Sequence, residues 1–93
     1  MLSKIPINLE KIKPGYIDKE ILRAALIAEL DAINLYEEMA ALAKNEGIRK
    51  VLLDVAKEEK EHVGEFQTLL LKFDKEQEKE LEEGKKEVEE LIK

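Results

Sequence analysis

Apolar residues recur every three or four positions along two long stretches of this chain, the pattern of a helix with one buried face. Both prolines lie in residues 1–17, which we expect to form an irregular leader, so neither interrupts the two stretches. We predict a first helix over residues 18–45 and a second over residues 48–73. Because only a short connection separates them, they should run antiparallel, which predicts an all-α fold.

Local signals predict where these helices begin and end. Asp18 is placed to cap the first helix, with Ile17 and Leu22 spaced for a hydrophobic staple across that cap. Gly47 is expected to end the first helix in a left-handed conformation. The predicted buried stripes are Leu22, Ala25, Leu26, Ala32, Ile33, Met39, Ala40 and Ala43 in the first helix, and Ile48, Leu52, Val55, Ala56, Val63, Phe66, Leu69, Leu70 and Phe73 in the second.

Residues 74–92 are almost wholly charged and predict a short C-terminal helix that has no core of its own. Asp74 could cap this helix, and Gly84 either costs it about 1 kcal/mol relative to alanine or allows a close contact. The helix is either solvated or forms a contact between copies of the chain. Its thin apolar stripe consists of Leu81, Val88, Leu91 and Ile92.

Three potential metal ligands fall on the two predicted buried stripes. Glu29 lies on the first, and Glu59-x-x-His62 lies on the second and contains the only histidine of the chain. A buried carboxylate loses several kcal/mol of solvation, so it needs a partner charge, a shared proton or a metal ion. Tyr36 follows Glu29 by two helical turns on the same stripe. This group therefore predicts a metal site.

Composition restricts the kind of site and of partner. The chain has no cysteine, which excludes thiolate zinc sites and iron–sulfur clusters and leaves nitrogen and oxygen ligands, a set that suits iron or manganese. The 22 acidic and 16 basic residues give a net charge of −6, which disfavours nucleic acid and anionic membranes as partners. No stretch approaches the roughly 20 apolar residues of a membrane span, and no secretion signal is evident, so we expect a cytoplasmic protein.

Two long helices and a polar third cannot enclose a four-helix core, but two copies of the chain can. In dimetal carboxylate bundles, two helices each contribute one Glu and the other two each contribute a Glu-x-x-His pair. Residues 1–93 would then be a single half-bundle domain. A homodimer would assemble two copies of Glu29, Glu59 and His62, giving four carboxylates and two imidazoles for two metal ions.

The arrangement resembles the encapsulated ferritins of the ferritin-like diiron superfamily, over about Asp18 to Phe73, with Glu29, Tyr36, Glu59 and His62 in the family's order and spacing. The resemblance implies a ferroxidase that oxidises Fe(II) to Fe(III) with dioxygen and binds two iron ions per dimer. It also implies an annular homodecamer that works inside an encapsulin nanocompartment, whose shell protein stores the ferric product.

On this resemblance we expect Glu59 to bridge the two irons and Glu29 and His62 to hold one iron each. Tyr36 is expected to be a nearby phenol that either contacts the ligands or is redox-active. Family members also have acidic residues that guide iron inward near the ligand on the first helix. Asp31 is suitably placed for that role and Glu65 is a weaker candidate, whereas Ala28 offers no carboxylate. The shell-targeting peptide or shell domain usual in the family is not evident up to Lys93.

Two other functions stay open. The chain could be a non-enzymatic helical interaction module whose buried Glu and His residues set the register of a dimer. Such a dimer would be indifferent to iron, whereas a ferroxidase would be stabilised by iron and would consume oxygen. The chain could also be a rubrerythrin-like peroxidase, but such enzymes normally need an electron-donor domain with cysteine ligands.

Overall fold

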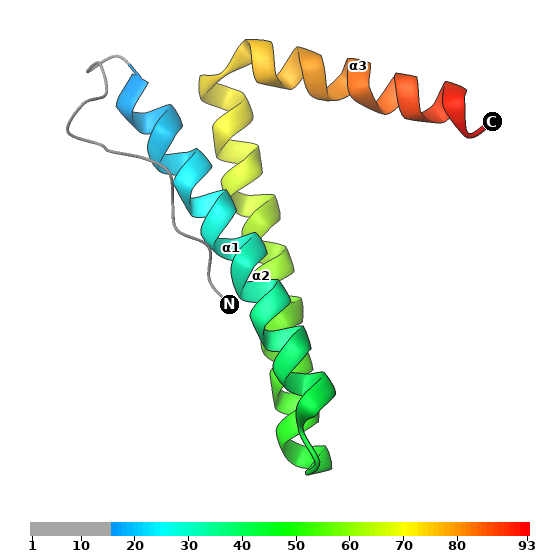
Figure 1. Cartoon of the computed structure of the whole chain (residues 1–93). Helices are drawn as coiled ribbons and strands as arrows, with labels where there is room; N and C mark the ends of the chain where they lie inside the picture. Colours follow the sequence, from blue (N-terminus) through cyan, green and yellow to red (C-terminus); the bar gives the residue numbers. More distant parts are fainter. Residues whose placement is uncertain (1–15) are drawn as a thin grey trace.

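The computed structural model describes residues 16–93, and this part of the chain contains three helices and no strand (Figure 1). Helix α1 spans Ile17–Leu42, α2 spans Glu46–Phe73 and α3 spans Lys75–Leu91. The predicted all-α class is confirmed. The predicted leader 1–17 lies outside the described residues except for Tyr16 and Ile17.

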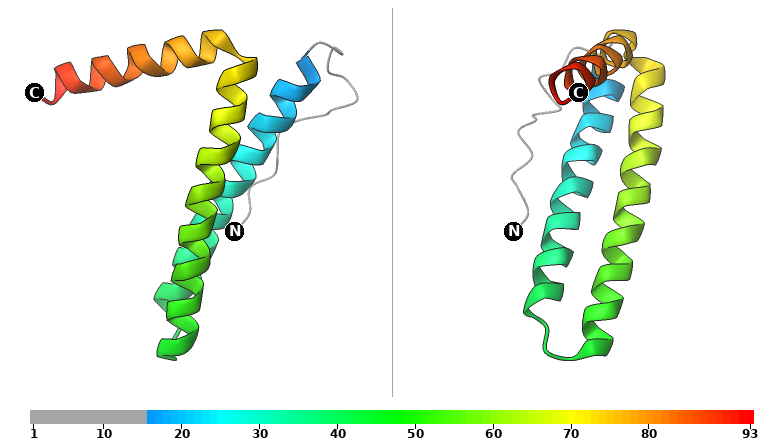
Figure 2. Two further views of the ribbon diagram at one scale, coloured as in Figure 1. Left: turned by 180° about the vertical axis from the view of Figure 1, so that it is seen from behind. Right: turned by 90° about the vertical axis from the view of Figure 1, so that its right-hand side faces the viewer.

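Helices α1 and α2 lie side by side as an antiparallel hairpin, and α3 leaves the hairpin at the end where α1 begins (Figure 2). An exposed ion pair between Lys60 Nζ and Glu37 Oε2, 2.9 Å apart, crosses from α2 to α1. Figure 1 shows α3 projecting away from the hairpin, and none of its residues is buried. None of the helices in the described part of the chain is long and apolar enough to cross a membrane.

The start of α1 differs from the prediction. The capping position is Tyr16, whose side chain makes no capping hydrogen bond, and Asp18 lies inside the first turn. Asp18 is therefore not the cap, although an acidic side chain there still interacts favourably with the positive end of the helix dipole. Ile17 lies inside the helix, after the capping position, whereas the first residue of a hydrophobic staple must lie before the cap. The predicted staple of Ile17 with Leu22 is therefore wrong.

The connection between α1 and α2 also differs. Ala43 ends α1 with extended backbone angles (φ −68°, ψ 135°), and the side chain of Asn45 caps α2 by accepting a hydrogen bond from the Ile48 amide at 3.0 Å. Gly47 lies within α2, and no described glycine has a positive φ. The predicted left-handed stop at Gly47 is wrong because the extended Ala43 already turns the chain.

The cap predicted for the third helix is confirmed: Oδ1 of Asp74 accepts a hydrogen bond from the Gln77 amide at 3.0 Å. A Cβ atom at Gly84 would meet no other atom within 4 Å. The close contact considered for Gly84 therefore does not occur among residues 16–93 of a single chain.

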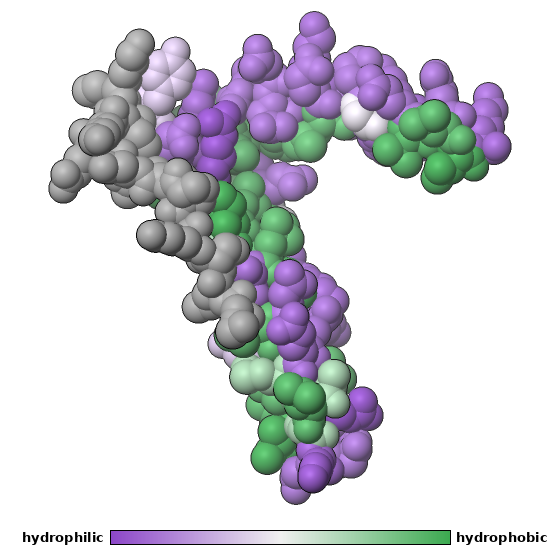
Figure 3. Space-filling model, viewed as in Figure 1, coloured by the Kyte–Doolittle hydropathy of each residue, from purple (hydrophilic) through white to green (hydrophobic). Residues whose placement is uncertain are grey.

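The core of the hairpin is small. Its buried apolar residues, Ile33, Ala40, Ala56 and Leu70, all belong to α1 and α2. Several residues of the predicted buried stripes are exposed, because two helices can cover only one side of each other. Figure 3 shows apolar surface on the hairpin and along the lower edge of α3, whose upper edge is hydrophilic. The exposed members of the predicted stripes are Met39, Ile48, Leu69 and Phe73.

Candidate metal centre

Helices α1 and α2 bring Glu29, Glu59 and His62 together near the middle of the hairpin. One potential ligand atom from each residue lies within 4.8 Å of the other two. Nδ1 of His62 is 3.3 Å from Oε2 of Glu29 and 3.3 Å from Oε2 of Glu59. Three of the four predicted site residues thus form one cluster.

Helix geometry explains why these residues meet. Glu59 and His62 are three residues apart on α2, so their side chains are neighbours on one face of that helix. The antiparallel hairpin places Glu29 of α1 opposite them, although it lies 33 residues before His62 in the chain. Helical periodicity places the first two side chains, and the pairing of the helices places the third.

The neighbouring carboxyl groups of Glu29 and Glu59 shift each other's pKa in opposite directions. A hydrogen bond to Glu59, helped by partial burial and by the negative charge of Glu59, raises the pKa of the Glu29 carboxyl. The same hydrogen bond lowers the pKa of Glu59, because the carboxyl of Glu29 donates to its carboxylate. The site therefore gathers negative charge that a cation would neutralise.

The imidazole of His62 faces this charge. A hydrogen bond to Glu59, and in second place the contact with Glu29, raises the pKa of His62 above its ordinary value. With a proton on Nδ1, His62 donates to the carboxylates; without that proton, the same nitrogen has a lone pair that a metal ion can bind. A proton and a metal ion are thus alternatives at one atom.

In the single chain one side of the cluster is open. The side chains of Glu29 and Glu59 are each 19% exposed, and that of His62 is 44% exposed. The sequence predicted buried ligands, but these are half-buried, because the hairpin supplies only two helices around them. The open side leaves room for further ligands or for a second chain.

The structure does not place the other candidate residues in this cluster. Tyr36 is half-buried on α1, two turns and hence about 10 Å along the axis from Glu29. Asp31 is half-buried and Glu65 is exposed. Within residues 16–93, no other group of three His, Cys, Asp or Glu residues has ligand atoms close enough to hold a metal ion.

The donor set fits a divalent cation such as iron. Carboxylate oxygens and an imidazole nitrogen suit Fe(II) and Mn(II), and the absence of cysteine removes the ligands of structural zinc and iron–sulfur sites. Three protein ligands on one side leave positions free for water, dioxygen or ligands from another chain.

Comparisons with known proteins identify a family and a solved structure that this chain is similar to. The sequence profile described as rubrerythrin matches residues 20–93. The crystal structure of an encapsulated ferritin domain from Pyrococcus furiosus superposes with a TM-score of 0.83 and 55% sequence identity, covering 98% of this chain and 93% of that one.

Two curated relatives are longer than this chain. A ferritin-like–encapsulin shell fusion protein of Pyrococcus furiosus is 57% identical over 93 residues, which cover 98% of this chain but 27% of that protein. The encapsulin nanocompartment cargo protein EncC of Myxococcus xanthus is 41% identical over 56 residues, or 60% of this chain and 43% of that protein. The matched part thus covers less than half of the length of either relative.

Proposed function

The chain belongs to the rubrerythrin family of ferritin-like proteins, and we propose that it is a ferroxidase, which oxidises Fe(II) to Fe(III) with dioxygen. The observation that carries this proposal is the convergence of Glu29, Glu59 and His62 within 4.8 Å of one another. Two carboxylates and one imidazole are ligands that suit iron.

The complete site is proposed to form between two copies of the chain. A homodimer would bring the open sides of two clusters together and would close a four-helix bundle around them. Four carboxylates would then carry four negative charges, which match the charges of two Fe(II) ions. The many exposed apolar residues of the hairpin, such as Leu30, Val51 and Leu53, supply surface that a second copy could bury.

Each residue has a distinct proposed role. Glu59, which is within reach of both Glu29 and His62, would be the ligand shared by the two iron ions, and Glu29 and His62 would each hold one of them. Two Fe(II) ions would give up one electron each, and these two electrons with two protons would reduce one dioxygen to hydrogen peroxide. Tyr36 is proposed to lie near the irons of the assembled dimer as a hydrogen-bonding or redox-active phenol, and Asp31 to line the path of incoming iron.

The partner is proposed to be an encapsulin shell. One relative is described as a fusion of a ferritin-like protein with an encapsulin shell, and another as an encapsulin cargo protein. We propose that this chain likewise works inside an encapsulin nanocompartment in the cytoplasm, as an annular homodecamer, and delivers ferric iron for storage there.

An anaerobic Fe(II) titration followed by exposure to oxygen tests the proposal. Native mass spectrometry would report iron per dimer and the number of chains in the assembly, and an oxygen electrode would report turnover. The wild-type protein should bind two irons per dimer and consume oxygen as they oxidise. Replacing Glu59 by Gln keeps the size of the side chain but removes a ligand charge, and it should abolish rapid oxidation.

Glu58→Gln is the matched control, because Glu58 is the preceding residue of α2 and is exposed. This variant should oxidise iron like the wild type. A wild-type protein that forms a stable dimer without binding iron would instead identify a structural interaction module. Faster oxidation by hydrogen peroxide than by dioxygen would point to a peroxidase.

A further inference from the structure

Asp74 forms the corner between α2 and α3. It is the single residue between them, with φ −132° and ψ 89°. Its amide donates to the carbonyl of Leu70 at 2.9 Å, which closes α2, and its carbonyl accepts from the amide of Glu78 at 3.2 Å, which opens α3. Asp74 is also the only charged residue in the described part of the chain that is buried, with 5% of its surface exposed.

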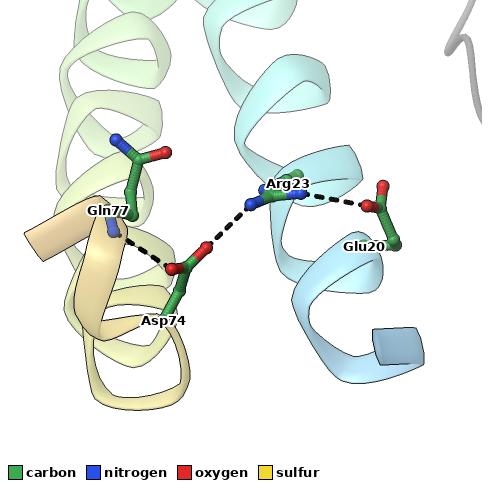
Figure 4. A network of polar contacts seen from close by, with 4 residues as sticks. All are labelled: Glu20, Arg23, Asp74 and Gln77. Carbon is green, nitrogen blue, oxygen red and sulfur yellow. Dashed lines mark hydrogen bonds and ion pairs between the residues drawn. The ribbon is translucent and has the colours of Figure 1, made fainter. Parts of the chain in front are cut away.

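The Asp74 carboxylate uses its two oxygens for two different helices (Figure 4). Oδ1 accepts the hydrogen bond from the Gln77 amide that caps α3. Oδ2 accepts a hydrogen bond of 2.7 Å from Nη2 of Arg23 on α1, 51 residues earlier in the chain. Arg23 also donates from Nη1 to Glu20 at 3.0 Å, so its guanidinium is held between two acids. Charge-assisted hydrogen bonds of this length are among the stronger polar contacts in proteins.

Apolar packing does not hold α3 in place at this corner. A groove of about 380 Å³ lies among the three helices, lined chiefly by Leu26, Ile27, Leu70 and Leu81. Leu81 is the α3 residue that reaches the apolar wall of this groove, and it is 42% exposed. No residue of α3 is buried, and the hydrogen bond from Arg23 to Asp74 joins the residue that caps α3 to α1.

We infer that the pair of Arg23 and Asp74 is a latch that fixes the direction of α3 relative to the hairpin. Asp74 caps α3 and makes the bend, and Arg23 fixes the bent corner to α1. The latch thereby decides where the apolar end of α3 is presented. That end consists of Val88, Leu91 and Ile92, which are 54%, 84% and 79% exposed. The inference does not depend on the proposed iron chemistry, because none of these residues is a predicted ligand.

Distance measurements between spin labels on α2 and α3 test the latch. The chain has no cysteine, so Lys57→Cys and Glu87→Cys, both at exposed positions, would provide two labelling sites without background. Mixing the labelled protein with an excess of unlabelled protein would suppress the signal from pairs of labels on different copies of the chain. If α3 is held in one direction, pulsed electron paramagnetic resonance should give one narrow distance peak. Far-ultraviolet circular dichroism would check that the three helices are intact.

Two variants should open the latch without uncapping α3. Arg23→Gln removes the guanidinium. Asp74→Asn keeps an oxygen that can cap α3 by accepting from the Gln77 amide. It replaces the oxygen that faces Arg23 by an NH₂ group, which cannot accept the hydrogen bond from Arg23. Arg49→Gln is the matched control, because Arg49 pairs only with Glu46 of its own helix, at 3.3 Å, among the contacts of the described residues.

We expect Arg23→Gln and Asp74→Asn to lose the single narrow distance peak while they keep their helical content. The control Arg49→Gln should keep the narrow peak. A narrow, unshifted peak in Arg23→Gln would overturn the latch, as would a broad distribution in the otherwise unmodified chain. Equal broadening in Arg49→Gln would show a general effect of charge, and loss of helical content in Arg23→Gln would show that the contact maintains α3 itself. Either result would also overturn it.

Discussion

Nδ1 of His62 lies 3.3 Å from Oε2 of Glu29, a residue 33 positions earlier in the chain and on the other long helix. The same nitrogen lies 3.3 Å from Oε2 of Glu59, and that hydrogen bond is the main reason why the pKa of His62 is raised. We predict that His62 of the metal-free protein titrates above its ordinary pKa of 6.5. Because it is the only histidine, its ring signals can be followed by NMR without overlap.

The protonated imidazole should stabilise the metal-free fold, so this contribution is fully present below the unfolded pKa and is lost as the pH rises through the raised, folded pKa. Glu59→Gln should lower the pKa of His62 more than Glu29→Gln does, since the bond to Glu59 contributes most. The exposed Glu58→Gln should leave it unchanged. A pKa of His62 at or below 6.5 in the wild-type protein would contradict the prediction.

The cluster of Glu29, Glu59 and His62 could be predicted from the sequence because it depends on two regular features. Helical spacing alone makes Glu59 and His62 neighbours, and an antiparallel hairpin with a short connection leaves little freedom in where Glu29 lies. Both features come from long periodic stretches, in which many residues carry the same signal.

Features decided by single residues were predicted less well. A capping interaction is worth only about 1 kcal/mol, so neighbouring contacts can move the start of a helix from Asp18 to Ile17. The turn at Ala43 carries no sequence signal comparable to glycine or proline. The contact of Arg23 with Asp74 joins residues 51 positions apart that lie on no common stripe, and only the folded corner reveals it.

Metal binding should weaken in acid. A metal ion at the cluster competes with the proton of His62 and, in more acidic solution, with the proton of Glu29, because the pKa of both groups is raised. Below the raised pKa, affinity should fall about tenfold per pH unit for each proton released. Anaerobic calorimetric titrations with Fe(II) between about pH 6 and pH 8, in buffers of different ionisation enthalpy, would count these protons. An affinity independent of pH would exclude His62 as a ligand.

Removing the cap of α2 should destabilise the hairpin. The Asn45 side chain accepts a hydrogen bond from the Ile48 amide, and Asn45→Ala would leave that amide without it. We expect a loss of about 1 kcal/mol in the free energy of unfolding, measured by chemical denaturation at a fixed protein concentration. Asn34→Ala is the control, because Asn34 is exposed inside α1 and alanine is the better helix former there. Equal losses in both variants would argue against the cap.

Replacing Gly84 by alanine should stabilise α3. A Cβ at this position meets no atom within 4 Å, and alanine in a helix interior is favoured over glycine by about 1 kcal/mol. Gly47→Ala provides the contrast, since its Cβ would lie 3.1 Å from the capping Oδ1 of Asn45 and should bring no such gain. Denaturation and size-exclusion chromatography would measure both. A less stable or dissociated Gly84→Ala protein would reveal a close contact from another copy.

The corner at Asp74 should loosen at low pH. The pKa of Asp74 is held below its ordinary 3.8, chiefly because the Gln77 amide donates to it and also because Lys19 and Arg23 are positive and near. Its contribution to stability is therefore fully present above pH 3.8 and is lost as the pH falls through the lowered pKa. Many other carboxylates titrate in this range, so the test is the difference in unfolding free energy between wild type and Asp74→Asn from about pH 5 to about pH 2.5. That difference should favour the wild type near pH 5 and shrink in acid, where the carboxyl is neutral and no longer attracts Arg23. A difference that stays constant down to the lowest pH would mean that the charge of Asp74 does not stabilise the corner.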